Sequence, residues 1–125
     1  IENRVSTIYS VRYDNNLIGY FTLSMSNIGK KEMLGDDTLN VQFHDYPSLL
    51  LGQIGVDINH RMGGIGQRIC SYCRGLGQVL NEKAACAFLI LRTTTDLARN
   101  YYEPKCHFRW KPSNKKVVWM YRKLF

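Results

Sequence analysis

A glycine-rich loop between an apolar strand and an amphipathic helix restricts the fold of this chain more than any other feature. Leucine, isoleucine and valine dominate residues 48–58, which predicts a buried strand. The loop that follows contains Arg61-Met62-Gly63-Gly64-Ile65-Gly66. Apolar residues then recur at helical spacing from Ile65 to Leu80. The sequence therefore predicts a strand–loop–helix unit within a sheet that is flanked by helices.

The same loop is suited to bind a diphosphate. Its glycines remove side chains, so that backbone N–H groups at the start of the helix can face an anion. Arg61 and Arg68 add positive charge nearby. The spacing is neither that of a nucleoside-triphosphate loop nor that of a G-x-G-x-x-G dinucleotide loop. Gly52 and Gly55 interrupt the preceding strand, as expected at a bulge or where a ligand approaches the backbone.

The rest of the chain predicts further strands on both sides of this unit. Two strand-like segments, residues 8–13 and 17–25, flank a turn at Asp14-Asn15-Asn16 and predict a hairpin. The other expected elements are a long surface connection over 26–46 with one short strand near 41–43, a buried strand over 84–91, a short helix over about 96–103 and a closing hairpin over 109–124. One of the threonines 93–95 is expected to cap the short helix, and Pro104 to end it.

Length and cysteine usage bound the class of protein. The 125 residues suit one domain over residues 1–125, and no apolar run approaches the roughly 20 residues of a membrane span. Only Cys70 and Cys73 have a C-x-x-C spacing, without a second ligand pair, so all four cysteines are expected to be buried, reduced thiols. We expect a cytoplasmic protein with neither a metal site nor a membrane partner.

Positive charge is concentrated at the C-terminal end. The formal net charge is +7, and no Asp or Glu follows Lys105. The basic residues of this end are Lys105, Arg109, Lys111, Lys115, Lys116, Arg122 and Lys123. They can attract the phosphates of a cofactor or a nucleic acid, or form only a solvated face. Trp110 and Trp119 lie among them and fit either base stacking or core packing.

The R-x-x-G-x-G loop, entered from a strand ending Ile54-Gly55-Val56-Asp57, resembles the signature of the GNAT acetyltransferase superfamily. The resemblance covers nearly the whole chain and implies a three-layer α/β (α+β) fold. Its central mixed, mostly antiparallel sheet is flanked by helices, and the family's N-terminal elements are partly missing. The activity implied is an acetyl-CoA-dependent N-acetyltransferase without a metal. The cofactor-binding residues implied are Ile54, Gly55, Val56, Arg61, Met62, Gly63, Gly64, Ile65, Gly66, Gln67 and Thr95.

A tyrosine pair follows the second predicted helix. The stretch Asp96-Leu97-Ala98-Arg99-Asn100-Tyr101-Tyr102 resembles the GNAT helix whose tyrosine often protonates the leaving thiolate of coenzyme A. Tyr102 takes that tyrosine's place and is the implied catalytic residue, whereas Tyr101 is expected to be a packing residue. The family usually has Gly-Phe a few residues later; here Glu103 to Phe108 is one residue longer and lacks the glycine.

Two segments, Tyr46–Asp57 and Leu17–Leu23, resemble one branch of the superfamily more closely, the GNAT toxins of toxin–antitoxin pairs. That resemblance implies the α-amine of aminoacyl-tRNA as acceptor and a small antitoxin as partner, and it leaves a homodimer open. No general base is evident among Asp57, His60 and Glu82, which favours an α-amine, with a pKa near 8, over lysine, near 10.4. Protein N-termini and small amines stay open as acceptors. The alternatives from other classes are a non-catalytic acetyl-CoA sensor and a nucleic-acid-binding module.

Overall fold

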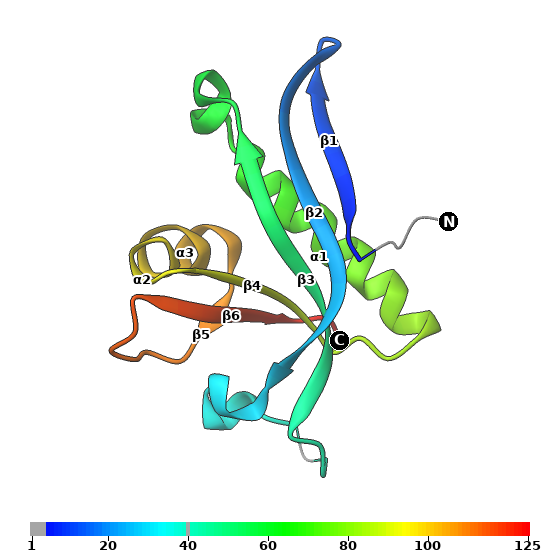
Figure 1. Cartoon of the computed structure of the whole chain (residues 1–125), viewed down its shortest axis with the longest axis vertical. Coiled ribbons are helices and arrows are strands. Elements are labelled where there is room, and N and C mark those ends of the chain that lie inside the picture. The colour runs from blue at the N-terminus through cyan, green and yellow to red at the C-terminus, as the bar shows by residue number, and fades with distance from the viewer. Residues whose placement is uncertain (1–4, 40) are drawn as a thin grey trace.

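A computed structural model describes residues 5–39 and 41–125 of the chain. It contains a six-stranded mixed sheet in the order β1-β2-β3-β4-β6-β5 (Figure 1). The strands are β1 (Thr7–Tyr13), β2 (Asn16–Gly29), β3 (Asp45–Val56), β4 (Phe88–Thr94), β5 (Arg109–Trp110) and β6 (Val117–Lys123). The helices are α1 (Ile65–Lys83), α2 (Thr95–Leu97) and α3 (Glu103–Cys106). Between α2 and α3 lies a π-helical turn, η4 (Ala98–Tyr102), and short 3₁₀ helices are η1 (Lys30–Glu32), η2 (Gly35–Asp37) and η3 (Ile58–Gly63).

The predicted N-terminal hairpin is confirmed. Asp14 and Asn15 turn the chain with φ values of 49° and 66°. Such positive values suit a tight two-residue hairpin turn, and Asp and Asn tolerate them better than most residues. β2 runs four residues beyond the predicted end at Met25, because its far half pairs with β3 as far as Gly29↔Asp45.

The parallel pair β3 and β4 shapes the centre of the molecule. They pair at only three positions, from Ser48↔Phe88 to Leu50↔Ile90, whereas β2 follows β3 as far as Val56. In Figure 1 β3 continues upward while β4 turns away toward α2, so the two strands diverge at their C-terminal ends. A bulge helps to bend β3: Phe21 pairs with Ile54 but Leu23 with Leu51, which leaves one extra residue at Gly52–Gln53.

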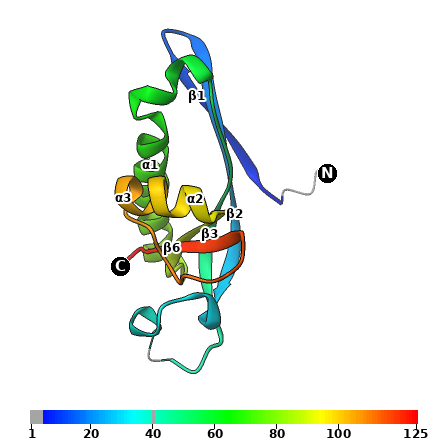
Figure 2. The same ribbon diagram turned by 90° about the vertical axis from the view of Figure 1, so that its left-hand side faces the viewer.

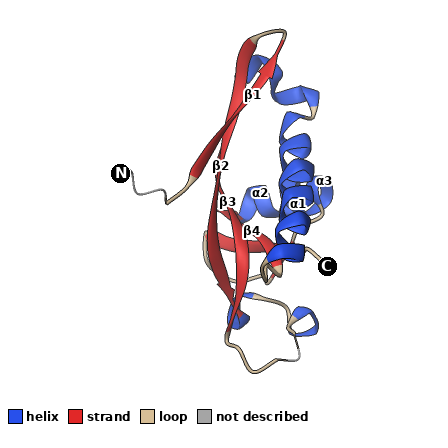
Figure 3. Cartoon of the chain, turned by 90° about the vertical axis from the view of Figure 1, so that its right-hand side faces the viewer, coloured by secondary structure: helices blue, strands red, loops and turns tan. Residues whose placement is uncertain are grey.

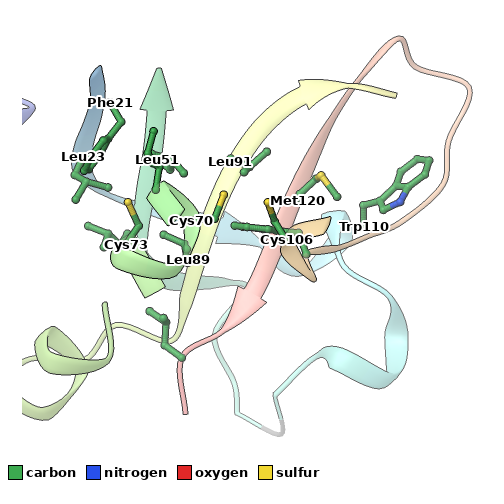
Figure 4. Packing of buried hydrophobic residues seen from close by; sticks show 14 of the residues in the cluster. Phe21, Leu23, Leu51, Cys70, Cys73, Leu89, Leu91, Cys106, Trp110 and Met120 are labelled. Carbon is green, nitrogen blue, oxygen red and sulfur yellow. The ribbon is translucent and has the colours of Figure 1, made fainter. Parts of the chain in front are cut away.

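The helices α1, α2 and α3 lie on one face of the sheet (Figures 2 and 3). The main core lies between that face and these helices, and Figure 4 shows Cys70, Cys73 and Cys106 among its apolar side chains. All four cysteines are free and buried, as predicted. In the described part of the chain, no helix is long and apolar enough to cross a membrane.

A second, smaller core occupies the opposite face, beneath residues 30–39. Its buried side chains are Ile28, Met33, Tyr46, Phe88, Ile90 and Tyr121. The short strand predicted near residues 41–43 is wrong: Val41 and Gln42 form bends, and Phe43 belongs to no helix or strand. The Tyr46 hydroxyl instead accepts from the N–H of Leu39 at 3.0 Å, and Lys30 N–H donates to the His44 carbonyl at 2.8 Å. These bonds hold the connection as a loop.

Pro104 does not end the second helical segment, contrary to prediction. It lies in the first turn of α3, and the helix continues to Cys106. The π-helical turn η4 precedes α3, and the N–H of Glu103 donates to the Ala98 carbonyl, so the helical segment continues through the proline. The segment ends at His107, whose φ is 62°.

Candidate active site

The glycine loop begins where β3 ends. The N–H of Asp57 donates to the Ile18 carbonyl at 2.7 Å, and the Asp57 carboxylate accepts from the N–H of Asn59 at 3.3 Å. That carboxylate thus caps η3, which replaces the tight loop predicted over 59–64. Gly64 then adopts a φ of 76° and joins η3 to α1. The turn presents the N–H groups of the first turn of α1 at a helix start, which is a favourable place for an anion.

The two arginines predicted to strengthen this site lie on different sides of it. Arg61 Nε donates to the Val56 carbonyl at 3.2 Å, so its side chain stays at the end of β3, beside the loop. Arg68 lines a hollow between the β1–β2 hairpin and α1, together with Arg12, Tyr13 and Tyr72. Gly66 is two residues from Arg68, and on a helix such positions face different directions. Only Arg61 therefore belongs to the loop itself.

The glycines of the loop have different surroundings. A Cβ atom built on Gly63 would meet no atom within 4 Å, so the loop is open there. A Cβ on Gly64 would lie 3.4 Å from Gln67 Oε1, which brings the side chain of Gln67 over the turn. A Cβ on Gly66 would lie 2.1 Å from the Tyr101 hydroxyl. Met62 contributes its backbone to η3, and its side chain lies outside what the structure describes.

The end of β3 offers unpaired backbone on the side that faces β4. Pairing with β4 stops at Leu50, so residues 51–56 have no strand partner on that side. The side chains of Ile54 and Val56 pack against the main core. Gly55 lies beneath the ring of Tyr20, because a Cβ there would be 2.3 Å from Tyr20 Cε1. The ring of Tyr20 thus explains why residue 55 is a glycine without a side chain. Gly52 lies at the bulge of β3.

The tyrosine pair lies in η4, and the Tyr101 hydroxyl reaches the loop at Gly66. The rings of Tyr101 and Tyr102 meet edge to face with centroids 5.0 Å apart, and Tyr102 meets Phe108 in the same way at 6.2 Å. Burial raises the pKa of Tyr102 to about 12 and also raises the pKa of Tyr101. Both phenols are therefore protonated at neutral pH. The Tyr101 hydroxyl contacts Gly66, and the Tyr101 ring contacts the Tyr102 ring, so Tyr101 lies between Tyr102 and the glycine loop.

The stretch after Tyr102 forms α3 and ends in a left-handed residue. The π-helical turn η4 precedes it and takes up one residue more per turn than an α-helix would. His107 adopts the left-handed conformation at the end of α3 and so occupies the backbone position that usually favours glycine. Phe108 is then buried in the core, with its N–H donating to the Tyr102 carbonyl at 3.2 Å. Sequence patterns alone did not predict the π-helical turn.

Thr95 lies at the start of α2 but does not cap it. The cap is Thr94, whose hydroxyl accepts from the N–H of Leu97 at 3.3 Å. The N–H of Thr95 donates to the Lys116 carbonyl at 3.0 Å, which ties this helix start to the C-terminal hairpin. The predicted threonine cap is therefore confirmed, and Thr95 stays a predicted cofactor contact.

The three candidate bases lie at η3 and in the last turn of α1, not in the segment that carries the tyrosine pair. His60 Nδ1 lies 3.3 Å from Asp57 Oδ2 in the exposed helix η3, and Glu82 lies in the last turn of α1. Within residues 5–39 and 41–125, no group of three or more His, Cys, Asp or Glu side chains could hold a metal ion.

No protein-family model and no curated protein matches this chain. Solved structures of GNAT toxins from toxin–antitoxin systems do share its fold. AtaT complexed with acetyl-methionyl-tRNAfMet matches with a TM-score of 0.79 and 14% identity, over 95% of this chain and 71% of that one. A tyrosine-to-phenylalanine mutant of KacT matches with a TM-score of 0.79 and 16% identity, over 96% and 72%. AtaTR bound with acetyl-CoA matches with a TM-score of 0.72 and 14% identity, over 96% and 71%.

These structures define the class of fold. At such identities the likeness concerns the fold alone, and that fold is the one implied by the resemblance of the glycine loop and its preceding strand to the GNAT superfamily. The chain therefore has the mixed-sheet α/β fold of the GNAT toxins KacT and AtaT.

Proposed function

We propose that this protein is an acetyl-CoA-dependent N-acetyltransferase and that its acceptor is the α-amine of aminoacyl-tRNA. The observation that carries the first part is the arrangement at the diverging end of β3 and β4. Unpaired β3 backbone, a glycine loop at a helix start and a pair of protonated tyrosines meet there. This combination suits an extended, diphosphate-bearing thioester better than it suits a nucleotide alone.

Each part has a role in this proposal. The pyrophosphate of acetyl-CoA is bound by N–H groups between Met62 and Gln67, and the pantetheine arm runs beside Ile54–Val56 as an added strand. Acetyl-CoA supplies the activated acyl group, which the acceptor amine attacks directly. An N–H near Val56 polarises the acetyl carbonyl, and Tyr102 donates a proton to the departing sulfur. The raised pKa keeps the phenol of Tyr102 protonated at neutral pH, which a general acid requires.

The acceptor is proposed on three grounds. The AtaT structure with the same fold holds acetyl-methionyl-tRNAfMet. The chain from Lys105 onward is basic and has no acidic residue, as suits a polyanionic substrate. The sequence makes no general base evident among Asp57, His60 and Glu82, and an α-amine, with a pKa near 8, needs less help than lysine does.

The fold also suggests partners. KacTA occurs in a complex with DNA, and AtaT has been solved with the C-terminus of its antitoxin AtaR. By analogy we propose a small antitoxin as the protein partner of this chain, and a homodimer as its own assembly. A cytoplasmic location follows from the proposed substrate.

The acceptor is tested with radiolabelled acetyl-CoA and three substrates: charged tRNA, uncharged tRNA and peptides with free N-termini. We expect label only on charged tRNA, and Tyr102→Phe should lower its rate roughly 10²-fold while acetyl-CoA affinity stays the same. Label on peptides alone would leave the acetyltransferase and remove the tRNA acceptor. Binding of acetyl-CoA without transfer to any amine would make the protein a sensor instead.

A further inference from the structure

A hollow beside the C-terminal hairpin is not used by the proposed chemistry. It measures about 250 Å³ and lies between η1 and the connection from β5 to β6. Its lining includes Lys31, Lys111, Lys115 and Trp119, and we call it the Trp119 hollow. Trp119 is half-buried: its side chain packs against the smaller core and also lines the hollow. An aromatic ring thus lies at the wall of a basic hollow.

The charges around this ring are mostly positive. Glu32 is the one acidic residue that lines the hollow, against three lysines. Arg92 pairs with Trp119 across β4 and β6, and its guanidinium carbon lies 6.0 Å from the centre of the indole ring. The Lys111 ammonium donates to the Lys31 carbonyl at 3.4 Å, which holds the hairpin loop against η1. The hollow therefore offers an aromatic surface surrounded by cations.

We propose that the Trp119 hollow binds an unpaired nucleotide of an RNA strand. The base stacks on the indole of Trp119, and the flanking phosphates contact Lys111, Lys115 and Arg92. Stacking together with basic groups is how proteins hold single-stranded nucleic acid, because every base has a π-face and every phosphate a charge. The hollow is smaller than the roughly 300–1,000 Å³ of sites for drug-sized ligands, as suits one base.

The position of the hollow connects it with the candidate active site. Its hairpin is bonded to the start of α2, where the N–H of Thr95 donates to the Lys116 carbonyl at 3.0 Å. The helical segment that starts there carries Tyr101 and Tyr102. The smaller core and the hollow lie on the face of the sheet opposite to that segment, so an RNA strand held at Trp119 would be anchored on the hairpin that is bonded to it. The choice of RNA rests on the proposed acceptor, but the binding itself does not depend on acetyl transfer.

The test uses a labelled 12-nucleotide single-stranded RNA without acetyl-CoA. We expect saturable binding by anisotropy and quenching of tryptophan fluorescence, since Trp110 is buried in the core and Trp119 is not. Trp119→Leu keeps apolar packing and should abolish quenching and weaken binding about tenfold or more. The logarithm of the binding constant falls linearly with the logarithm of the salt concentration, and the double variant Lys111→Gln/Lys115→Gln should reduce the magnitude of this salt slope by about 1.4, or 0.7 per phosphate contact.

A matched control has the same change in charge elsewhere. Lys83→Gln/Lys123→Gln neutralises two exposed lysines outside the hollow and should leave the slope and the quenching unchanged. The proposal is overturned if the control pair weakens binding as much as the hollow pair, or if Trp119→Leu binds like the wild type. Inorganic polyphosphate, which cannot stack, provides a second check. The proposal is also overturned if polyphosphate of equal charge displaces the RNA completely, and equally well from the wild type and from Trp119→Leu. A protein that binds RNA in this way but acetylates no amine would keep this inference and lose the proposed function.

Discussion

Gly64 determines the shape of the proposed phosphate site at the scale of a single residue. Its φ of 76° is left-handed, a conformation in which Asn and Asp are tolerated better than other side chains. We predict that Gly64→Asn retains much of the acetyl-CoA affinity and that Gly64→Asp loses about tenfold or more, because only the second places a negative charge at the helix start. Calorimetry on the two folded variants measures this difference.

The Asn variant serves as the control for the Asp variant, since the two side chains have nearly the same shape and differ in charge. Equal affinities for acetyl-CoA would mean that no phosphate lies over Gly64. The pyrophosphate would then have to be placed elsewhere, although the fold would stand.

At the scale of elements, the contact between α1 and η4 depends on Gly66. A Cβ at this position would lie 2.1 Å from the Tyr101 hydroxyl and 3.2 Å from Tyr101 Cζ. We predict that Gly66→Ala costs about 1–3 kcal/mol of unfolding free energy, the usual range for overpacking, and that Tyr101→Phe relieves much of this cost. Urea unfolding of the two single variants and the double variant gives the coupling directly.

Gly63→Ala provides the comparison, because a Cβ at Gly63 meets nothing within 4 Å. That change should alter the unfolding free energy by less than about 0.5 kcal/mol. If Gly66→Ala costs the same with and without the Tyr101 hydroxyl, the contact does not restrict residue 66.

The elements differ in how well the sequence predicted them. The strand–loop–helix unit was predictable because its apolar periodicity and glycines are local signals. The π-helical turn was not, since residues 98–102 carry no local pattern that distinguishes a π-helical turn from an α-helix. The separation of Arg68 from Arg61 likewise follows from how α1 packs against the hairpin. The strand predicted near residues 41–43 is wrong: the Tyr46 hydroxyl bonds the backbone of Leu39, just before that segment, and Val41 and Gln42 form bends.

At the scale of the whole molecule, a polar contact joins the connection after β2 to the last strand. The Tyr121 hydroxyl donates to Asp37 Oδ2 at 2.5 Å and accepts from the N–H of Leu34 at 3.0 Å. Arg109 Nε also donates to Asp37 Oδ2, at 2.7 Å. The connection thus stays over the smaller core because the Asp37 carboxylate and the Leu34 N–H form hydrogen bonds with residues of β5 and β6.

This contact predicts how stability changes in alkali. Burial first, and then the hydrogen bond to Asp37, raise the pKa of Tyr121 from 10.0 to about 12. Between these values the unfolded chain loses the phenolic proton while the folded chain keeps it, so folding stability falls as pH rises, by up to about 1.4 kcal/mol per pH unit for this group. Tyr121→Phe should therefore have a lower unfolding free energy at pH 8 but a shallower decline from pH 10 to 12. Urea unfolding at several pH values measures both effects, with Tyr13→Phe, at an exposed position, as the control. An unchanged slope in Tyr121→Phe would show that other groups cause the decline.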